Sequence, residues 1–163
     1  VHGRTLDEIY SGPPAADVIR AVRDALPVPV IANGGIMDAE SATRLRHDTG
    51  CSRIMLARGA IGNPWLFREI SDPTYEGPSH EDICTELERH VRGMIELYGE
   101  SRAMRHGRKI VSAYLRGRGY RSSRRKEATS LCTEEEFRHF LDAIRREGPV
   151  GKCRNRRRDT SHG

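Results

Sequence analysis

Two short apolar segments, each followed by glycines, restrict the folds that the first half of this chain can adopt. Residues 28–32 lead into Asn-Gly-Gly at 33–35, and residues 53–57 lead into Arg-Gly at 58–59. Apolar residues at helical spacing precede the first segment, separate the two and follow the second. Helices that alternate with short apolar strands are typical of parallel sheets with crossover helices. Such strands are usually covered on both faces, so we expect residues 28–32 to be buried on both sides.

The second half of the chain differs from the first in charge and in periodicity. Residues 1–78 carry 8 Lys or Arg against 10 Asp or Glu, a net charge of −2, whereas residues 79–163 carry 20 against 13, a net charge of +7. Three stretches there have apolar residues at helical spacing. We therefore expect a first domain over 1–70, a Pro/Gly-containing linker over 71–79, a helical domain over 80–147 and a basic, disordered tail over 148–163.

The glycines at the two strand ends predict a binding site for a phosphate. Ligands of parallel α/β proteins bind at the carboxyl ends of the strands. Glycines there let backbone N–H groups approach an anion, and a following helix adds its N-terminal donors. Arg58 would add a bidentate contact. Either loop alone is explained as well by a tight turn, and Arg58 alone by a surface ion pair; the two loops together favour the phosphate site.

Five motifs in register resemble those of the tRNA-dihydrouridine synthases. They are Val-His-Gly-Arg-Thr at 1–5, Pro-Val-Ile-Ala-Asn-Gly-Gly-Ile at 29–36, Met-Leu-Ala-Arg-Gly-Ala at 55–60, Gly-Asn-Pro-Trp-Leu-Phe at 62–67 and Met-Arg-His-Gly-Arg-Lys-Ile-Val-Ser-Ala-Tyr-Leu at 104–115. The resemblance implies an α/β fold: the C-terminal part of an FMN-binding TIM (β/α)8 barrel, followed by a small all-helical domain that binds tRNA. It also implies the flavin-dependent reduction of uridine to 5,6-dihydrouridine in tRNA, with NADPH as the reductant.

The resemblance assigns roles to individual residues. Arg4 lies in the motif beside the flavin and the substrate and is assigned to RNA. The family often has Gly-Arg in the second loop, where this chain has Ala57 before the arginine, and alanine does not adopt a positive φ without strain. The first loop also departs, with Asn-Gly-Gly where the family often has Asn-Gly-Asp. The residues that correspond to FMN contacts are His2, Asn33, Gly34, Gly35, Ala57 and Arg58.

The catalytic cysteine of the family is not found in this chain. In the family a cysteine in an Asn-x-Gly-Cys-Pro loop is the general acid, and that pattern does not occur here. The start at Val1 also resembles the middle of a domain. We therefore assign no catalytic residue and expect a fragment that is inactive alone. Two other interpretations stay open: another FMN- or phosphate-binding TIM-barrel enzyme, and a non-catalytic RNA-binding remnant.

A basic stretch indicates a polyanionic partner. Residues 101–126 carry ten Arg or Lys and no Asp or Glu, and such a surface binds a phosphate backbone through counterion release. A solvated charged face is the alternative. Tyr114 and Tyr120 are candidates for base stacking, although the spacing of Tyr114 also fits the core. The RNA-binding candidates on this stretch are Arg102, Arg105, Arg108 and Lys109.

Membrane, metal and disulfide-rich classes find no support in the sequence. No apolar run approaches the roughly 20 residues of a membrane-spanning helix. The cysteines at 51, 84, 132 and 153 form no Cys-x-x-Cys pair, which disfavours a zinc site or a disulfide scaffold and suits a reducing, cytoplasmic location. His106 and His139 have no partner at metal-ligand spacing. We expect a monomer that binds no metal.

Overall fold

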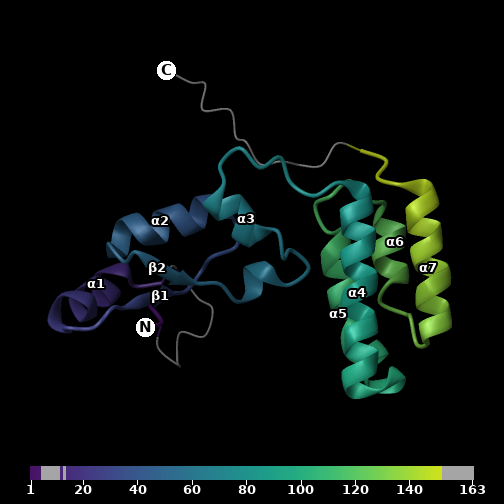
Figure 1. The fold of residues 1–163 in the computed structure, drawn as a ribbon, viewed down its shortest axis with the longest axis horizontal. Coiled ribbons are helices and arrows are strands. Elements are labelled where there is room, and N and C mark those ends of the chain that lie inside the picture. Colours follow the sequence, from purple (N-terminus) through teal and green to yellow (C-terminus); the bar gives the residue numbers. More distant parts are fainter. Residues whose placement is uncertain (5–11, 13, 152–163) are drawn as a thin grey trace. The chain divides into compact units, whose positions relative to one another are not determined.

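The computed structural model of the chain describes residues 1–4, 12 and 14–151, which form two compact units. The first unit spans Val1–Gly77 and the second spans Pro78–Gly163. Their boundary falls inside the segment 71–79 that the sequence predicts as a linker. Most of the tail predicted over 148–163 lies outside the described residues. Figure 1 shows strands and helices in the first unit and helices in the second.

The first unit alternates helices and parallel strands. β1 and β2 are parallel, with Asn33 opposite Met55. His2 makes a parallel bridge to Asn33. The backbone N–H of Asn33 donates to the carbonyl of Val1, and the N–H of Gly3 donates to the carbonyl of Asn33. Residues 1–3 therefore lie along the edge of β1 that faces away from β2. The predicted alternation is confirmed, with shorter strands than expected. The elements are α1 (Ala16–Ala25), β1 (Ile31–Asn33), α2 (Ala39–Thr49), β2 (Arg53–Met55), the 3-10 helix η1 (Arg58–Ala60) and α3 (Leu66–Ser71).

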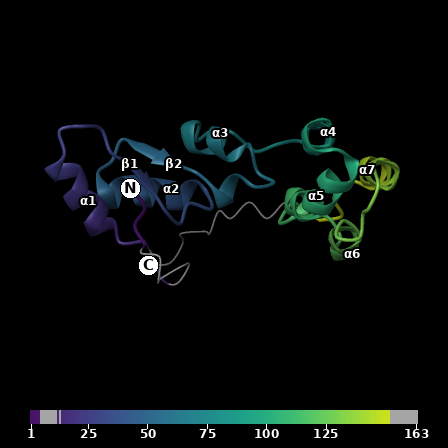
Figure 2. The ribbon, with the colours of Figure 1, turned by 90° about the horizontal axis from the view of Figure 1, so that it is seen from below.

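The core of the first unit lies on one face of its sheet. Figure 2 shows α1 and α2 on the same side of the two strands. The opposite face carries Ile31 and Met55, which are 45% and 56% exposed. The prediction that residues 28–32 are buried on both faces is therefore wrong, because successive strand residues point to opposite faces and the described helices cover only one. The buried cluster comprises Ile19, Val30, Ala32, Ile36, Ala42, Leu45 and Cys51.

The described part of the second unit consists of helices. α4 and α5 form a hairpin around Gly99, which has φ +75°. α7 packs against α4, and α6 packs against α5. Tyr114 is 1% exposed and belongs to the core. The helices are α4 (His80–Tyr98), α5 (Glu100–Leu115), α6 (Ser122–Glu127) and α7 (Glu134–Glu147).

Capping boxes set the starts of three helices. In each box the N-cap side chain accepts a hydrogen bond from a backbone N–H three residues on, and that residue's side chain accepts one from the N-cap N–H. The pairing satisfies donors that the helix itself leaves open. The pairs are Asp38 with Ser41 in α2, Ser79 with Asp82 in α4 and Thr133 with Glu136 in α7.

Two features of the second unit differ from the sequence expectations. The sequence does not predict α6, because its segment lacks apolar periodicity and none of its residues is buried. Ion pairs of Arg124 with Glu127 and Glu147 stabilise this helix instead. Tyr120 is only 7% exposed, and its hydroxyl lies 2.7 Å from Nδ1 of His80. The prediction that Tyr120 stacks on bases is therefore wrong. Among the described helices, none is long and apolar enough to cross a membrane.

Candidate functional site

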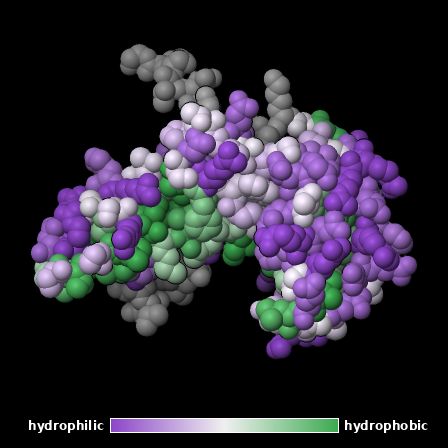
Figure 3. Space-filling model, viewed as in Figure 1, coloured by the Kyte–Doolittle hydropathy of each residue, from purple (hydrophilic) through white to green (hydrophobic). Residues whose placement is uncertain are grey.

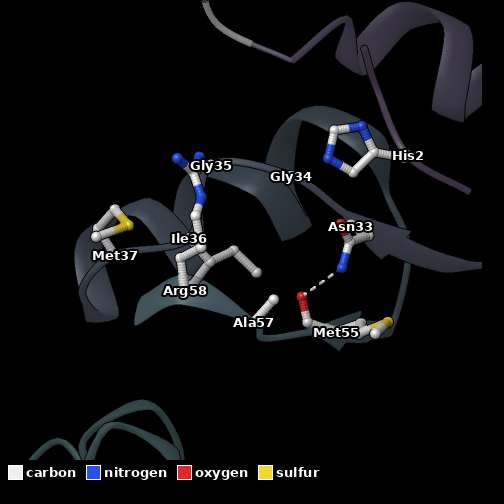
Figure 4. Close-up of a pocket in the computed structure, with 9 residues that line it drawn as sticks. All are labelled: His2, Asn33, Gly34, Gly35, Ile36, Met37, Met55, Ala57 and Arg58. Atoms are coloured by element: carbon white, nitrogen blue, oxygen red, sulfur yellow. Dashed lines mark hydrogen bonds between the residues drawn. The ribbon is translucent and has the colours of Figure 1, made fainter. Parts of the chain in front are cut away.

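The carboxyl ends of β1 and β2 meet around a pocket in the first unit. Its volume is about 180 Å³, below the roughly 300–1,000 Å³ of a complete small-molecule site, so it has room for part of a ligand. Figure 4 shows the guanidinium of Arg58 beside Gly35 and the ring of His2 across the pocket. None of the described lining residues is acidic. They are His2, Asn33, Gly34, Gly35, Ile36, Met37, Met55, Ala57 and Arg58.

The first loop, which follows β1, depends on two consecutive glycines. Gly34 has φ +136° and Gly35 has φ +69°, a region that side chains rarely adopt. The loop also has no room for a side chain at Gly34, because a Cβ there would lie 2.9 Å from Cβ of Pro14. The backbone of this loop therefore forms the pocket wall itself, with no side chain between it and a ligand.

Hydrogen bonds hold the side chains of Asn33 and His2 at the pocket. Nδ2 of Asn33 donates to the carbonyl of Met55 across the sheet at 3.1 Å, the bond drawn in Figure 4. Nδ1 of His2 accepts from the backbone N–H of Arg4 at 3.1 Å. Nδ1 also lies 3.4 Å from the carbonyl oxygen of Arg4. In the tautomer in which Nδ1 accepts from the Arg4 N–H, the donor of the ring is Nε2.

The second loop reaches the first through Gly59. A Cβ on Gly59 would lie 2.5 Å from the carbonyl oxygen of Ile36 and 3.0 Å from Cα of Met37. Only glycine permits this approach, which places the exposed Arg58 beside the first loop. Ala57 has φ −131° and ψ −92°, so this position is not in the left-handed region that favours glycine over alanine.

Some backbone donors at the start of α2 are used within the chain. Oδ1 of Asp38 accepts from Ser41 N at 2.9 Å, and Oγ of Ser41 accepts from the backbone N–H groups of Met37 and Asp38 at 3.0 and 3.1 Å. The capping box therefore takes up one backbone N–H of the first turn of α2. The expectation that a following helix supplies N-terminal donors stays a prediction.

The sequence of the chain is similar to that of known proteins. The family model described as dihydrouridine synthase (Dus) matches residues 1–147. The chain belongs to the dihydrouridine synthase family. It is 37% identical over 122 residues to tRNA-dihydrouridine synthase B of Pasteurella multocida, covering 72% of this chain and 37% of that protein. It is 34% identical over 149 residues to tRNA-dihydrouridine synthase B of Yersinia pestis, covering 88% and 46%. The chain thus spans less than half the length of these relatives.

All six residues that the family resemblance predicts as FMN contacts line this pocket. Three further lining residues, Ile36, Met37 and Met55, were not predicted. The sequence contained a signal for Met55, because it lies on a strand two positions before the predicted pocket residue Ala57. In the parallel pairing of the strands, Met55 is opposite Asn33. The role of Gly59 was also missed, since a glycine that makes room for another loop has no local signature.

Arg4, assigned to RNA by the family resemblance, contacts the carbonyl of Gly12. Its Nε and Nη2 donate to Gly12 O at 3.2 and 2.7 Å. Its Nη1 is buried and has no hydrogen-bond partner among the described residues. Two of the five N–H donors of Arg4 are thus used by the chain itself. Nη2 lies 4.0 Å from a Cβ placed on Gly35, so the guanidinium is near the pocket wall.

Three of the four cations predicted on the basic face of α5 are exposed. Arg102, Arg105 and Lys109 are exposed, and none of them has a hydrogen bond or ion pair within the described residues. Arg108 is different: its Nε donates to the carbonyl of Leu131 at 2.7 Å, and its Nη2 lies 3.0 Å from Sγ of Cys132. Its inclusion on the exposed face is a correction, because the guanidinium ties α5 to the segment before α7.

The structure describes three of the four cysteines of the chain. Cys51 and Cys84 are buried and Cys132 is exposed, and all three are free thiols; Cys153 lies outside the described residues. Burial raises the pKa of the Cys84 thiol to about 11, so it stays protonated at neutral pH. In the part of the chain that the structure describes, no group of three or more His, Cys, Asp or Glu is placed to hold a metal ion.

Proposed function

We propose that this chain forms the part of a tRNA-dihydrouridine synthase that holds the phosphate end of FMN and contacts tRNA through α5. One observation carries the first half of this proposal: the six residues matched to the family's FMN contacts, drawn from three separate segments, surround a single pocket. Segments at the two loops and at residues 1–4 meet there because parallel strands bring their carboxyl ends to the same edge.

The residues at the pocket suit a phosphate group. The wall is backbone at Gly34 and Gly35, no described lining residue is acidic, and Arg58 supplies a guanidinium that matches the geometry of a phosphate. Nε2 of His2 adds a donor on the opposite side. When bound, FMN would supply the electrons that reduce the C5–C6 double bond of uridine, with NADPH as their source.

In this proposal the chain's own residues bind and orient rather than react. Arg58 and the loop backbone neutralise and position the phosphate, and Asn33 fixes the spacing of β1 and β2 beneath it. The proton for C5 of the uracil requires a general acid. Cys51, the cysteine of the first unit, is buried in the core and is not among the residues that line the pocket. We propose that the 163 residues alone form no dihydrouridine.

Flavin titration of the protein that contains this chain tests the phosphate site. Arg58→Ala is expected to weaken FMN binding by about 1.5–3 kcal/mol, the scale of a hydrogen bond to a charged group, which is about 10- to 150-fold. Riboflavin, which lacks the phosphate, should bind both proteins equally. Arg44→Ala is the control, because Arg44 pairs with Glu40 on the exposed face of α2 and is not among the residues that line the pocket. Equal FMN affinity of the Arg58 variant and wild type would remove the phosphate site from the proposal.

The inactivity of the 163 residues is tested by assaying dihydrouridine in unmodified tRNA incubated with the purified chain, FMN and NADPH. No product above a control without protein is expected. Dihydrouridine formed by the chain alone would show that a group within it serves as the acid.

Salt-dependent tRNA binding tests the role of α5. Replacing Arg102, Arg105 and Lys109 with Ala should lower the slope of log K against log salt by about 2 to 3, since each lost phosphate contact removes about 0.7–0.9. FMN content should stay at the wild-type level, because these residues are not in the first unit. An unchanged slope would identify the face as solvated surface.

A further inference from the structure

One proline ring packs against glycines from two of the segments that form the pocket. Cβ of Pro14 lies 2.8 Å from a Cβ placed on Gly3 and 2.9 Å from one placed on Gly34, and its Cγ and Cδ each lie 3.3 Å from a Cβ placed on Gly35. The ring therefore fills the space that side chains at these three positions would need. Pro14 is not among the residues that line the pocket, so it acts on the pocket through these glycines.

The start of α1 holds the proline ring in place. The backbone N–H of Ala15, the N-cap of α1, donates to the carbonyl of Gly3 at 2.6 Å, and the N–H of Gly3 donates to the carbonyl of Asn33 at 3.2 Å. Ile19 of α1 is fully buried, and its Cδ1 lies 3.1 Å from a Cβ placed on Gly3. The ring of a proline also fixes its own φ. Pro14 is thus a rigid point against which the first loop packs.

The first loop has little stiffness of its own. Gly34 has φ +136° and Gly35 has φ +69°, and glycine loses more conformational freedom on ordering than any other residue. A loop that was not held would have to be ordered by its ligand, and the cost of ordering would be subtracted from the affinity. Because the Pro14 ring contacts both glycines, it removes part of that cost before the ligand arrives.

We propose that Pro14 is a positioning residue of the phosphate site, whose ring holds the backbone of Gly34 and Gly35 in the shape that receives the anion. This inference rests on the proposed function, in which the pocket holds the phosphate of FMN. It assigns a role in ligand affinity to a residue that lies outside the pocket wall and contacts no ligand itself.

The test compares wild type, Pro14→Ala and Pro27→Ala in the protein that contains this chain, by titration with FMN and with riboflavin. Pro14→Ala keeps Cβ but removes Cγ and Cδ, the atoms next to Gly35. FMN binding should weaken about 5- to 30-fold, the cost of ordering the backbone of one residue. Riboflavin, which has no phosphate, should bind all three proteins equally. Pro27 is exposed and does not line the pocket, so Pro27→Ala should bind FMN as wild type does.

Sedimentation of each protein accompanies the titrations, because Figure 3 shows apolar surface on the first unit, where Ile31 and Met55 are 45% and 56% exposed. Loss of FMN affinity in a Pro14→Ala protein with the wild-type oligomeric state supports the positioning role. Loss that occurs only in a self-associated form of the variant would assign the effect to a covered pocket and overturn the proposal.

The remaining outcomes separate this inference from the proposed function. Equal FMN affinity of Pro14→Ala and wild type would overturn the positioning role and leave the phosphate site standing. Equal weakening of FMN and riboflavin would also overturn it, because the ring would then support the whole unit rather than the loop.

A second variant covers the case in which Pro14→Ala does not fold by circular dichroism. Pro14→Val keeps carbon atoms at the β and γ positions but lacks the Cδ that lies next to Gly35. It should weaken FMN binding without changing riboflavin binding, and FMN affinity equal to that of wild type would overturn the proposal. If wild type binds FMN no more tightly than riboflavin, the proposed phosphate site falls and the inference falls with it.

Discussion

Substitution of Gly59 by alanine tests how closely the two loops of the pocket must approach. The added Cβ would lie 2.5 Å from the carbonyl oxygen of Ile36, where ordinary contact begins at 3.4 Å, so the loops must separate by about 0.9 Å. Cδ2 of Leu66 is also close, at 3.0 Å. Overpacking of this kind costs about 1–3 kcal/mol, and the lower entropy of the unfolded alanine chain offsets about 0.4–1 kcal/mol. We expect a net loss of roughly 1–2 kcal/mol.

The measurement is denaturant unfolding followed by tryptophan fluorescence. Trp65 is the only Trp of the chain and immediately precedes α3 in the first unit, so its fluorescence reports on the unit that holds the pocket. The transition of Gly59→Ala should move to lower denaturant. FMN affinity should fall as well, because Ile36 and Met37 line the pocket.

Gly93→Ala is the matched control. Gly93 lies within α4, and a Cβ there would meet nothing within 4 Å. Alanine at an exposed helix interior should therefore stabilise the second unit by about 0.8–1 kcal/mol, measured by circular dichroism, with the Trp65 transition unchanged. If Gly59→Ala leaves the Trp65 transition where it is in wild type, the contact between the loops is not as close as described and the reasoning fails.

Three further predictions concern the second unit. Arg108→Ala should destabilise it by about 1 kcal/mol, because the variant loses a hydrogen bond from a charged group that is partly exposed to solvent. The salt dependence of tRNA binding should not change. Burial lowers the pKa of His90 in the folded protein, so the unfolded chain binds the proton more readily. The unfolding free energy should therefore fall as the pH drops through about 6.5, the ordinary range of histidine, and this fall should be smaller in His90→Gln. Thr133→Ala should cost about 1 kcal/mol through loss of the α7 cap, and Thr133→Ser should restore it, both read by thermal unfolding.

Local sequence determined where the helices with capping boxes begin. Ser79 and Asp82 are three residues apart, so their contacts form within one turn and need no distant partner. The composition of the pocket was predictable for a related reason. Asn33 and Ala57 follow successive parallel strands, and the carboxyl ends of such strands lie at the same edge of the sheet whatever covers its faces.

Tertiary structure alone decided which of these side chains are available. Arg108 and Lys109 are neighbours in a basic stretch, yet Arg108 donates to the carbonyl of Leu131 while Lys109 is exposed. Tyr98 and Tyr114 both occur at apolar helical spacing, yet they are 52% and 1% exposed. Periodicity tells which residues share a face of a helix, but burial depends on how far the neighbouring helices extend along that face, and this is set by contacts between residues distant in sequence.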